Sequence, residues 1–213
     1  MTQALPTATD FHTLSPCALA DVLTQEHVMD YCLRPLWTST PRVAGPAYPV
    51  QCAPGDNLML HAAIHRAPPG AVIVVEAGDT TFAVAGGNVC AVAQRRGIAA
   101  FVVDGVIRDL AEMRAIGFPV FARGLSPIPG RKAGPGRLNA PVRCGGIQVS
   151  PGDMIVADEE GIVAVPGERL SEVWAAARKK ADRDAATPLD VWEAEHRARI
   201  EQLLQPGFSS GEA

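Results

Sequence analysis

Two short apolar runs, at residues 71–75 and 99–103, constrain the fold of this chain of 213 residues more than any other feature. The first is almost entirely β-branched and both are bounded by turn residues, which is typical of strands buried on both faces. The segment between them, 89–96, follows Gly86-Gly87 and precedes Gly97, a pattern that favours a helix. Strand, helix and strand over about thirty residues form a βαβ unit with parallel strands and a right-handed crossover. The chain therefore predicts an α/β fold.

Further elements extend this unit on both sides. Capping residues followed by helix-forming runs predict helices at three more places: 16–28, 58–65 and 109–116. Strands are predicted at 119–122 and 145–149, with a hairpin over 153–157 and 161–165. The polar, proline-rich stretch 34–49 lies between the first helix and the next. These elements predict one α/β domain over residues 1–166.

The C-terminal part has a different composition. From Glu168 the chain becomes helical and highly charged, with a break at Thr187-Pro188. We expect residues 167–213 to form a helical extension that packs on a neighbouring subunit. The polar tail, 209–213, is expected to be disordered.

Composition excludes several classes of protein. The sum of 19 Lys and Arg against 23 Asp and Glu leaves no basic field for a nucleic-acid backbone. The five cysteines are scattered without a C-x-x-C pair, which indicates neither a disulfide framework nor a zinc site: Cys17, Cys32, Cys52, Cys90 and Cys144. No apolar run approaches the roughly 20 residues of a membrane span, and no basic residue precedes Arg34. We therefore expect a soluble, cytoplasmic protein without a nucleic-acid or membrane partner.

The strongest candidate site is the segment 103–112, where Asp104, Asp109 and Glu112 accompany Arg108. We expect Asp104 just past the carboxyl end of a strand, and Asp109 and Glu112 on one face of the next helix. A hard cation such as Mg²⁺ takes one or two carboxylates, and Arg108 offers planar donors to an oxyanion. An ordinary charged helix start explains the same residues, because acidic side chains there complement the helix dipole.

A second candidate is the glycine entry 85–89, whose free N–H groups at a helix start can hold an anion. It lacks the spacing of dinucleotide or triphosphate loops, and a simple tight turn is the alternative interpretation. However, it follows one strand of the βαβ unit while Arg108 and Asp109 follow the parallel partner. Both segments should emerge at the same sheet edge and form one pocket.

Three weaker patterns remain. His61 and His65 have the i, i+4 spacing of zinc ligands, but no third ligand accompanies them and a core or surface role is favoured. The loop 130–137 carries three cations that could bind an anion, although such loops are more often solvated. The acidic run 158–160 suits a turn and is assigned no role.

Four stretches together resemble a known family. They are Pro54-Gly55-Asp56-Asn57, Gly86-Gly87 with Arg108-Asp109 downstream, Val103-Asp104-Gly105-Val106-Ile107-Arg108-Asp109, and Pro151-Gly152-Asp153-Met154-Ile155-Val156-Ala157-Asp158. Over residues 54–166 the chain resembles the 4-hydroxy-4-methyl-2-oxoglutarate / 4-carboxy-4-hydroxy-2-oxoadipate aldolases and the related RraA-like regulators of ribonuclease activity. The resemblance implies an α-β-β-α sandwich with a βαβ core, assembled into homotrimers or homohexamers with active sites near subunit interfaces.

The resemblance also implies roles for individual residues. Asp109 would be the direct ligand of Mg²⁺ or Mn²⁺, Arg108 would contact the keto and carboxylate oxygens of a small 2-oxo acid, and Asp104 and Glu112 would orient metal-bound water. The backbone of four residues would bind the pyruvyl end: Gly86, Gly87, Asn88 and Val89. The acidic residue that such aldolases often carry at the position of Gly87 is missing. The carboxylate from a neighbouring subunit has no unique match among Asp182, Asp184, Asp190, Glu193 and Glu195.

The expected reaction is metal-dependent cleavage of 4-hydroxy-2-oxo acids to pyruvate, with oxaloacetate decarboxylation through the same enolate. No lysine lies in residues 55–122, so a Schiff-base mechanism is not expected. Two alternatives come from other classes. One is a non-catalytic regulator that binds an RNA-processing enzyme, and the other is a binding module that keeps the pocket without turnover. The acidic residues Asp104, Asp109 and Glu112 favour the enzyme.

Overall fold

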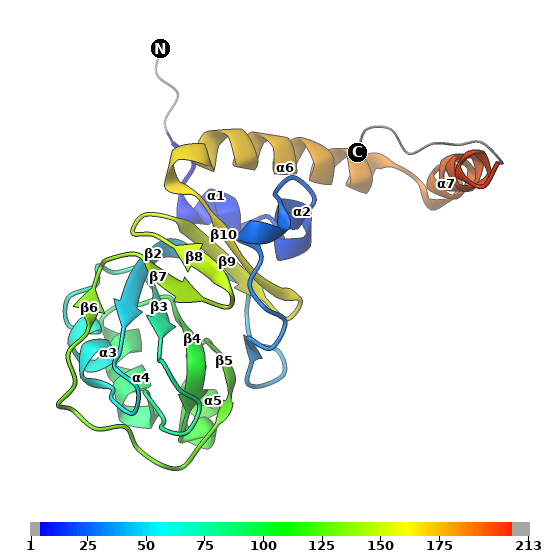
Figure 1. The fold of residues 1–213 in the computed structure, drawn as a ribbon. Helices are drawn as coiled ribbons and strands as arrows, with labels where there is room; N and C mark the ends of the chain where they lie inside the picture. Colours follow the sequence, from blue (N-terminus) through cyan, green and yellow to red (C-terminus); the bar gives the residue numbers. More distant parts are fainter. Residues whose placement is uncertain (1–4, 206–213) are drawn as a thin grey trace.

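The computed structural model describes residues 5–205, which fold around one curled sheet (Figure 1). The eight-stranded sheet has the order β1-β5-β4-β3-β2-β9-β10, with β6 paired to β2, and β7 and β8 form a separate hairpin. The strands of the larger sheet are β1 (Arg34–Pro35), β2 (Val43–Gln51), β3 (Val72–Glu76), β4 (Ala100–Ile107), β5 (Val120–Leu125), β6 (Arg137–Leu138), β9 (Met154–Asp158) and β10 (Gly161–Val165). The hairpin strands are β7 (Val142–Cys144) and β8 (Ile147–Val149).

Helices cover both outer faces of this sheet. They are α1 (Ala8–His12), α2 (Pro16–Ala20), α3 (Leu58–Ala63), α4 (Gly87–Arg95), α5 (Leu110–Ile116) and α6 (Leu170–Ala186), whereas α7 (Leu189–Leu203) follows α6 and does not cover the sheet. Two short 3₁₀ turns, Gln25–His27 and Gly167–Arg169, connect them to the strands. The predicted βαβ unit is confirmed, because β3 and β4 pair in parallel and α4 lies between them in the chain.

Three apolar cores divide the described residues into four layers. The first core lies between helices α3, α4 and α5 and the sheet around β3 and β4. The second lies inside the curled sheet, where β3 and β4 face β7, β8, β9 and β10. The third joins β9 and β10 to helices α1, α2 and α6. Because each core joins two layers, the order is helix, sheet, sheet, helix, and the predicted α-β-β-α arrangement of the RraA-like type is confirmed.

Strand β2 links the two halves of the sheet and was not predicted. Its first residues, from Val43 to Pro46, pair antiparallel with β9, and its later ones, from Ala47 to Gln51, pair parallel with β3. Pro46 and Pro49 have no backbone N–H to donate to a neighbouring strand, so the sequence around them is typical of a loop. The strand forms because its alternate residues are buried between two partner strands.

Several predicted boundaries were wrong. The helix predicted at 16–28 ends at Ala20, and only a 3₁₀ turn follows at Gln25–His27. The helix predicted at 58–65 ends at Ala63. Strand β4 continues to Ile107, so Asp104 lies within the strand and not past its end. The longer β4 changes the expected position of the Asp104 carboxylate in the candidate site.

The C-terminal segment has two differently packed helices. Helix α6 buries Leu170, Val173 and Ala177 against the body, whereas α7 has no buried residue in the described part of the chain. The predicted break at Thr187-Pro188 is confirmed, and the tail predicted at 209–213 lies outside the described residues. None of the helices within residues 5–205 combines the length and hydropathy of a membrane span.

Candidate active site

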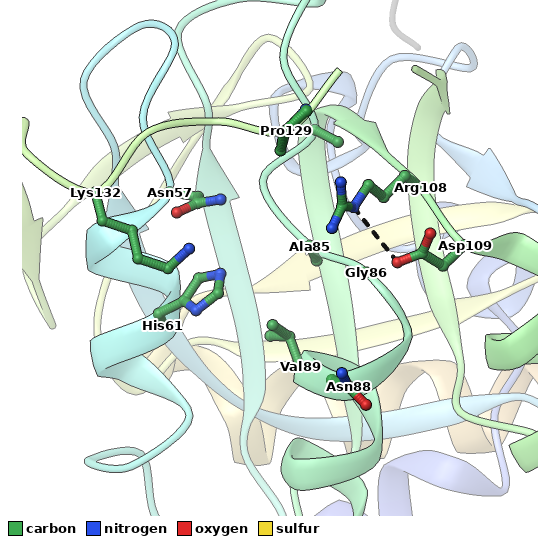
Figure 2. Close-up of a pocket in the computed structure, with 11 residues that line it drawn as sticks. Asn57, His61, Ala85, Gly86, Asn88, Val89, Arg108, Asp109, Pro129 and Lys132 are labelled. Carbon is green, nitrogen blue, oxygen red and sulfur yellow. Dashed lines mark ion pairs between the residues drawn. The ribbon is translucent and has the colours of Figure 1, made fainter. Parts of the chain in front are cut away.

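A cavity of about 210 Å³ lies at the carboxyl ends of β2, β3 and β4, where the loops that follow these strands meet (Figure 2). Ligand sites of parallel sheets are expected at this edge. Its lining residues are Asn57, His61, Ala83, Ala85, Gly86, Asn88, Val89, Arg108, Asp109, Pro129 and Lys132. The glycine entry to α4 and the Arg108-Asp109 pair therefore share one pocket, as the sequence predicts. A cavity of this size suits a small metabolite better than a drug-sized ligand.

Backbone hydrogen bonds join the glycine entry to the end of β4. The N–H of Val84 donates to the carbonyl of Val106 at 3.0 Å, and the N–H of Arg108 donates to the carbonyl of Ala85 at 3.0 Å. Cys90 is the first α4 residue whose N–H reaches a carbonyl, that of Gly86 at 3.1 Å. The N–H groups of Asn88 and Val89 therefore stay available at the helix start, where the dipole favours an anion.

Asp109 has an unusual backbone conformation. It precedes α5 with φ 60° and ψ 40°, in the left-handed region that few residues other than glycine and asparagine adopt. Its Oδ2 accepts a hydrogen bond from the N–H of Gly87 at 3.2 Å and lies 3.4 Å from Nε of Arg108. Residues in such sparsely populated backbone conformations cluster at active sites and ligand-binding sites. Asp109 thus precedes α5 instead of beginning it as predicted, and its carboxylate faces the start of α4, where the Glu112 side chain also lies.

Gly86 leaves room for the Asp109 carboxylate. A Cβ at position 86 would collide with Oδ2 of Asp109 and would lie 3.2 Å from Cγ of Arg108. The backbone conformation of Gly86 is extended, so any residue could adopt it, and close approach is the only requirement for glycine. Glycine is therefore needed at position 86 because the start of α4 packs closely against Arg108 and Asp109.

Replacing Gly86 with alanine tests this contact. We expect Gly86→Ala to displace the Asp109 carboxylate and to lower turnover by about 10²-fold, because small misplacements of catalytic groups have effects of that order. Release of pyruvate, the product that the family resemblance implies, measures turnover, and thermal unfolding checks that the fold survives. Gly124→Ala in β5 is the matched control, since a Cβ there meets nothing within 4 Å. Full activity of Gly86→Ala would show that the contact is dispensable.

Glu112 occupies the space beside Gly87. A Cβ at Gly87 would collide with the carboxylate of Glu112, which projects from the first turn of α5. An acidic side chain at position 87 is therefore impossible without moving Glu112. The carboxylate of Glu112 therefore lies beside Gly87, where the family resemblance led us to expect an acidic residue at position 87 itself.

Asp104 does not lie in the pocket. Its carboxylate accepts hydrogen bonds from Nε of Arg123 and, at 2.7 Å, from the N–H of Gly145. Residues alternate between faces along a strand, and Asp104 follows Val103, which packs in the core beneath the helices. Asp104 consequently points to the side of the sheet that carries the β7–β8 hairpin. This position corrects the expectation that Asp104 works beside Arg108 and Asp109.

The opposite end of the pocket holds three polar residues that the sequence did not bring together: Asn57, His61 and Lys132. Lys132 comes from the loop for which anion binding was one interpretation. The absence of lysine from residues 55–122 therefore does not mean that the pocket lacks one, because Lys132 enters it from outside that segment. The signals that could have found this end were the Pro54-Gly55-Asp56-Asn57 motif and the cationic loop, each of which was weak alone.

Asp56 holds the Lys132 loop against α3. Its carboxylate accepts hydrogen bonds from the N–H groups of Leu58 at 2.8 Å, Ala133 at 2.6 Å and Gly134 at 2.7 Å. Burial alone would raise the pKa of Asp56, but these donors and the charge of Arg131 hold the pKa below its usual value. Asp56 therefore remains ionised at neutral pH and fixes Lys132 near His61.

The pocket carries more positive than negative charge. Arg108 and Lys132 line it together with one carboxylate, that of Asp109. Burial, with the positive charges of Lys132 and His65, lowers the pKa of His61 to about 4, although Asp56 acts in the opposite direction. His61 is thus neutral at physiological pH, and the pocket is suited to an anionic ligand.

Comparisons with known proteins show the family to which the chain belongs. The RraA-like family, described as Aldolase/RraA, matches residues 16–164. A protein of Halalkalibacterium halodurans named "Putative 4-hydroxy-4-methyl-2-oxoglutarate aldolase" is 38% identical over 201 residues, covering 93% of this chain and 95% of its own.

Solved structures show the same fold. RraAS2 of Streptomyces coelicolor, described as an unusual member of the RNase ES inhibitor RraA family, superimposes with a TM-score of 0.74 at 27% identity, covering 86% of this chain and 98% of its own. The structure described as the RNA-processing inhibitor RraA from Thermus thermophilis gives a TM-score of 0.64 at 26% identity, covering 78% and 94%. Matched over most of its length by the family and by a full-length relative, the chain belongs to the RraA-like (Aldolase/RraA) family.

Proposed function

We propose that this protein is a divalent-metal-dependent lyase that cleaves 4-hydroxy-2-oxo acids to pyruvate and decarboxylates oxaloacetate through the same enolate. The candidate substrates are 4-hydroxy-4-methyl-2-oxoglutarate and 4-carboxy-4-hydroxy-2-oxoadipate. The observation that carries the proposal is the meeting of Asp109, Arg108 and the free N–H groups of α4 in one small cavity. The names of aldolase relatives support it.

Asp109 fits the requirements of a Mg²⁺ or Mn²⁺ ligand. Hard cations take one or two carboxylates and complete their coordination with water and substrate oxygens. The Asp109 side chain is 36% exposed at the cavity, and residues 5–205 contain no cluster of three or more His, Cys, Asp or Glu that would form a full protein cage. When bound there, the cation would supply Lewis-acid polarisation of the substrate's keto group. Glu112, behind Gly87, would accept hydrogen bonds from water at this end of the site.

Arg108 and the start of α4 would bind the substrate's 2-oxo acid end. The guanidinium offers planar donors to a carboxylate or to the oxygen on which negative charge develops. The N–H groups of Asn88 and Val89 point from the positive end of the helix dipole and would hold the other oxygens. Cleavage and decarboxylation both leave an enolate at this end, so one arrangement serves both reactions.

Pyruvate release tests the proposal directly. Purified protein is incubated with each substrate in Mg²⁺, in Mn²⁺ and in excess EDTA, and pyruvate is followed with a coupled enzyme. We expect release that depends on the cation. Reduction with borohydride in the presence of pyruvate tests the alternative that Lys132 forms a Schiff base, because it would trap a covalent adduct. Activity that resists EDTA and is lost on reduction would overturn the metal-dependent mechanism.

A regulator of an RNA-processing enzyme is the second candidate function, and the similarity to two RraA structures favours it. Such a role requires a protein-binding surface and no turnover. Absence of pyruvate from every substrate, together with inhibition of a purified ribonuclease, would support the regulator. The binding-module interpretation predicts ligand binding without either activity.

Self-association is part of the proposal. Helix α7 projects away from the body (Figure 1), has no buried residue within the described chain, and exposes Leu189, Trp192 and Leu203. Helices of this length owe most of their stability to packing, so we propose that α7 packs on a neighbouring subunit of a homotrimer or homohexamer. Asp182 and Asp184 are already paired with Arg178 and Lys180. Among the acidic residues that the sequence left as alternatives, those of α7 are therefore the better candidates to complete a neighbouring site: Asp190, Glu193 and Glu195.

A further inference from the structure

The end of the cavity opposite Arg108 is built to receive a hydrogen-bond donor. Oδ1 of Asn57 is buried without a hydrogen-bond partner in the described residues, and the residue is only 5% exposed. Its amide group donates to the carbonyl of Gly130 at 3.2 Å, which fixes the side chain. One turn further along the chain, His61 lines the same cavity, and its neutral imidazole has one nitrogen that can accept a hydrogen bond. A purely anionic ligand would offer this nitrogen no donor.

A cation lies beside these acceptors. Figure 2 shows Lys132 on the side of His61 and Asn57, across the cavity from Arg108 and Asp109. The loop that carries it is held by Asp56 and by a hydrogen bond of 2.8 Å from the N–H of Asn57 to the carbonyl of Arg131. This end of the pocket therefore matches a ligand with a hydroxyl group next to a carboxylate.

We propose that His61 accepts the proton of the substrate's 4-hydroxyl group during aldol cleavage, while Lys132 binds the carboxylate attached to the same carbon. The inference rests on the proposed lyase function and deepens it. With the 2-oxo acid end at Arg108 and Asp109, carbon 4 lies toward the far end of the cavity. The hydroxyl group then meets His61, and the carboxylate on carbon 4 meets Lys132.

The step balances without a further reactant. The hydroxyl proton moves to the imidazole, the oxygen becomes a carbonyl, and the bond between carbons 3 and 4 breaks. Its electron pair enters the pyruvate enolate, which later takes a proton at carbon 3. Burial is the largest cause of the lowered pKa of His61, and the charge of Lys132 is the next, which a substrate carboxylate bound to Lys132 would offset. The imidazole therefore becomes a better proton acceptor when the correct substrate is bound.

Oxaloacetate distinguishes the roles of the two ends of the cavity, because it has no 4-hydroxyl group for His61 to deprotonate. Its decarboxylation forms the same enolate at Arg108 but releases CO₂ without deprotonating an alcohol. The His61 side chain should therefore matter much more for aldol cleavage than for decarboxylation. A residue with a merely structural role would affect both reactions alike.

The experiment compares His61→Gln and His61→Asn with His65→Gln, a matched control in an exposed position of the same segment. kcat and KM are measured for 4-hydroxy-4-methyl-2-oxoglutarate and for oxaloacetate with saturating Mg²⁺. We expect both His61 variants to lose about 10²-fold or more in kcat for cleavage, as for removal of a general base. The ratio of cleavage to decarboxylation should fall at least tenfold, mainly in kcat and not in KM. His65→Gln should keep both activities.

The outcomes distinguish this inference from the function on which it rests. If the wild-type protein releases no pyruvate from either substrate, the lyase proposal fails. If the wild type is active and both folded His61 variants lose the two activities in equal proportion, or lose neither, the assignment of His61 is wrong. Circular dichroism and thermal unfolding identify a variant that does not fold. The assignment of His61 is accepted only if His61→Gln and His61→Asn show the same change in the ratio of cleavage to decarboxylation.

Discussion

Asp109→Asn is expected to lower metal-dependent pyruvate release by at least about 10³-fold, because a metal centre contributes several kcal/mol of transition-state stabilisation. The fold should survive the change. Asparagine is among the few residues that adopt the left-handed conformation measured at position 109, and its side-chain oxygen can still accept from the N–H of Gly87. The variant thus removes a negative charge while keeping shape and backbone.

Three measurements separate loss of the metal from loss of structure. Calorimetric titration with Mn²⁺ should show weakened binding, the thermal unfolding midpoint should stay close to that of the wild type, and kcat/KM for oxaloacetate should fall. Asp21→Asn is the control, because Asp21 is an exposed aspartate that pairs with Lys180 outside the pocket. Metal-stimulated turnover that persists in Asp109→Asn would exclude Asp109 as the ligand.

The part of the fold that could be predicted is the part that local pattern determines. Strand β3 and the first half of β4 are apolar runs bounded by turn residues, and α4 has glycines at both ends. Strand β2 is different, because its prolines resemble those of a loop and its burial comes from β3 and β9, which are distant in the sequence. Non-local pairing of this kind leaves little signal in a single sequence.

The same distinction applies to the site. Arg108, Asp109 and the α4 entry could be placed together because both segments follow parallel strands at one sheet edge. Asp104 was misplaced since β4 runs three residues beyond it, to Ile107, and alternation turns its side chain to the other face. His61 and Lys132 line the same cavity because Asp56 and the backbone of Asn57 bind the loop 130–134, more than seventy residues away in the chain. No spacing rule predicts that contact.

Arg108→Ala is expected to lower kcat for both substrates by about 10²–10³-fold, the usual effect of removing one donor to a developing oxyanion. Nε of Arg108 lies 3.4 Å from the Asp109 carboxylate, so its loss should leave Mn²⁺ binding unchanged or slightly stronger while turnover falls. That combination distinguishes Arg108 from Asp109, whose loss should weaken binding and turnover together. Arg108→Lys keeps the charge without the planar pair of donors and should retain intermediate activity. Unchanged kcat in Arg108→Ala would mean that the N–H groups of Asn88 and Val89 stabilise the enolate alone.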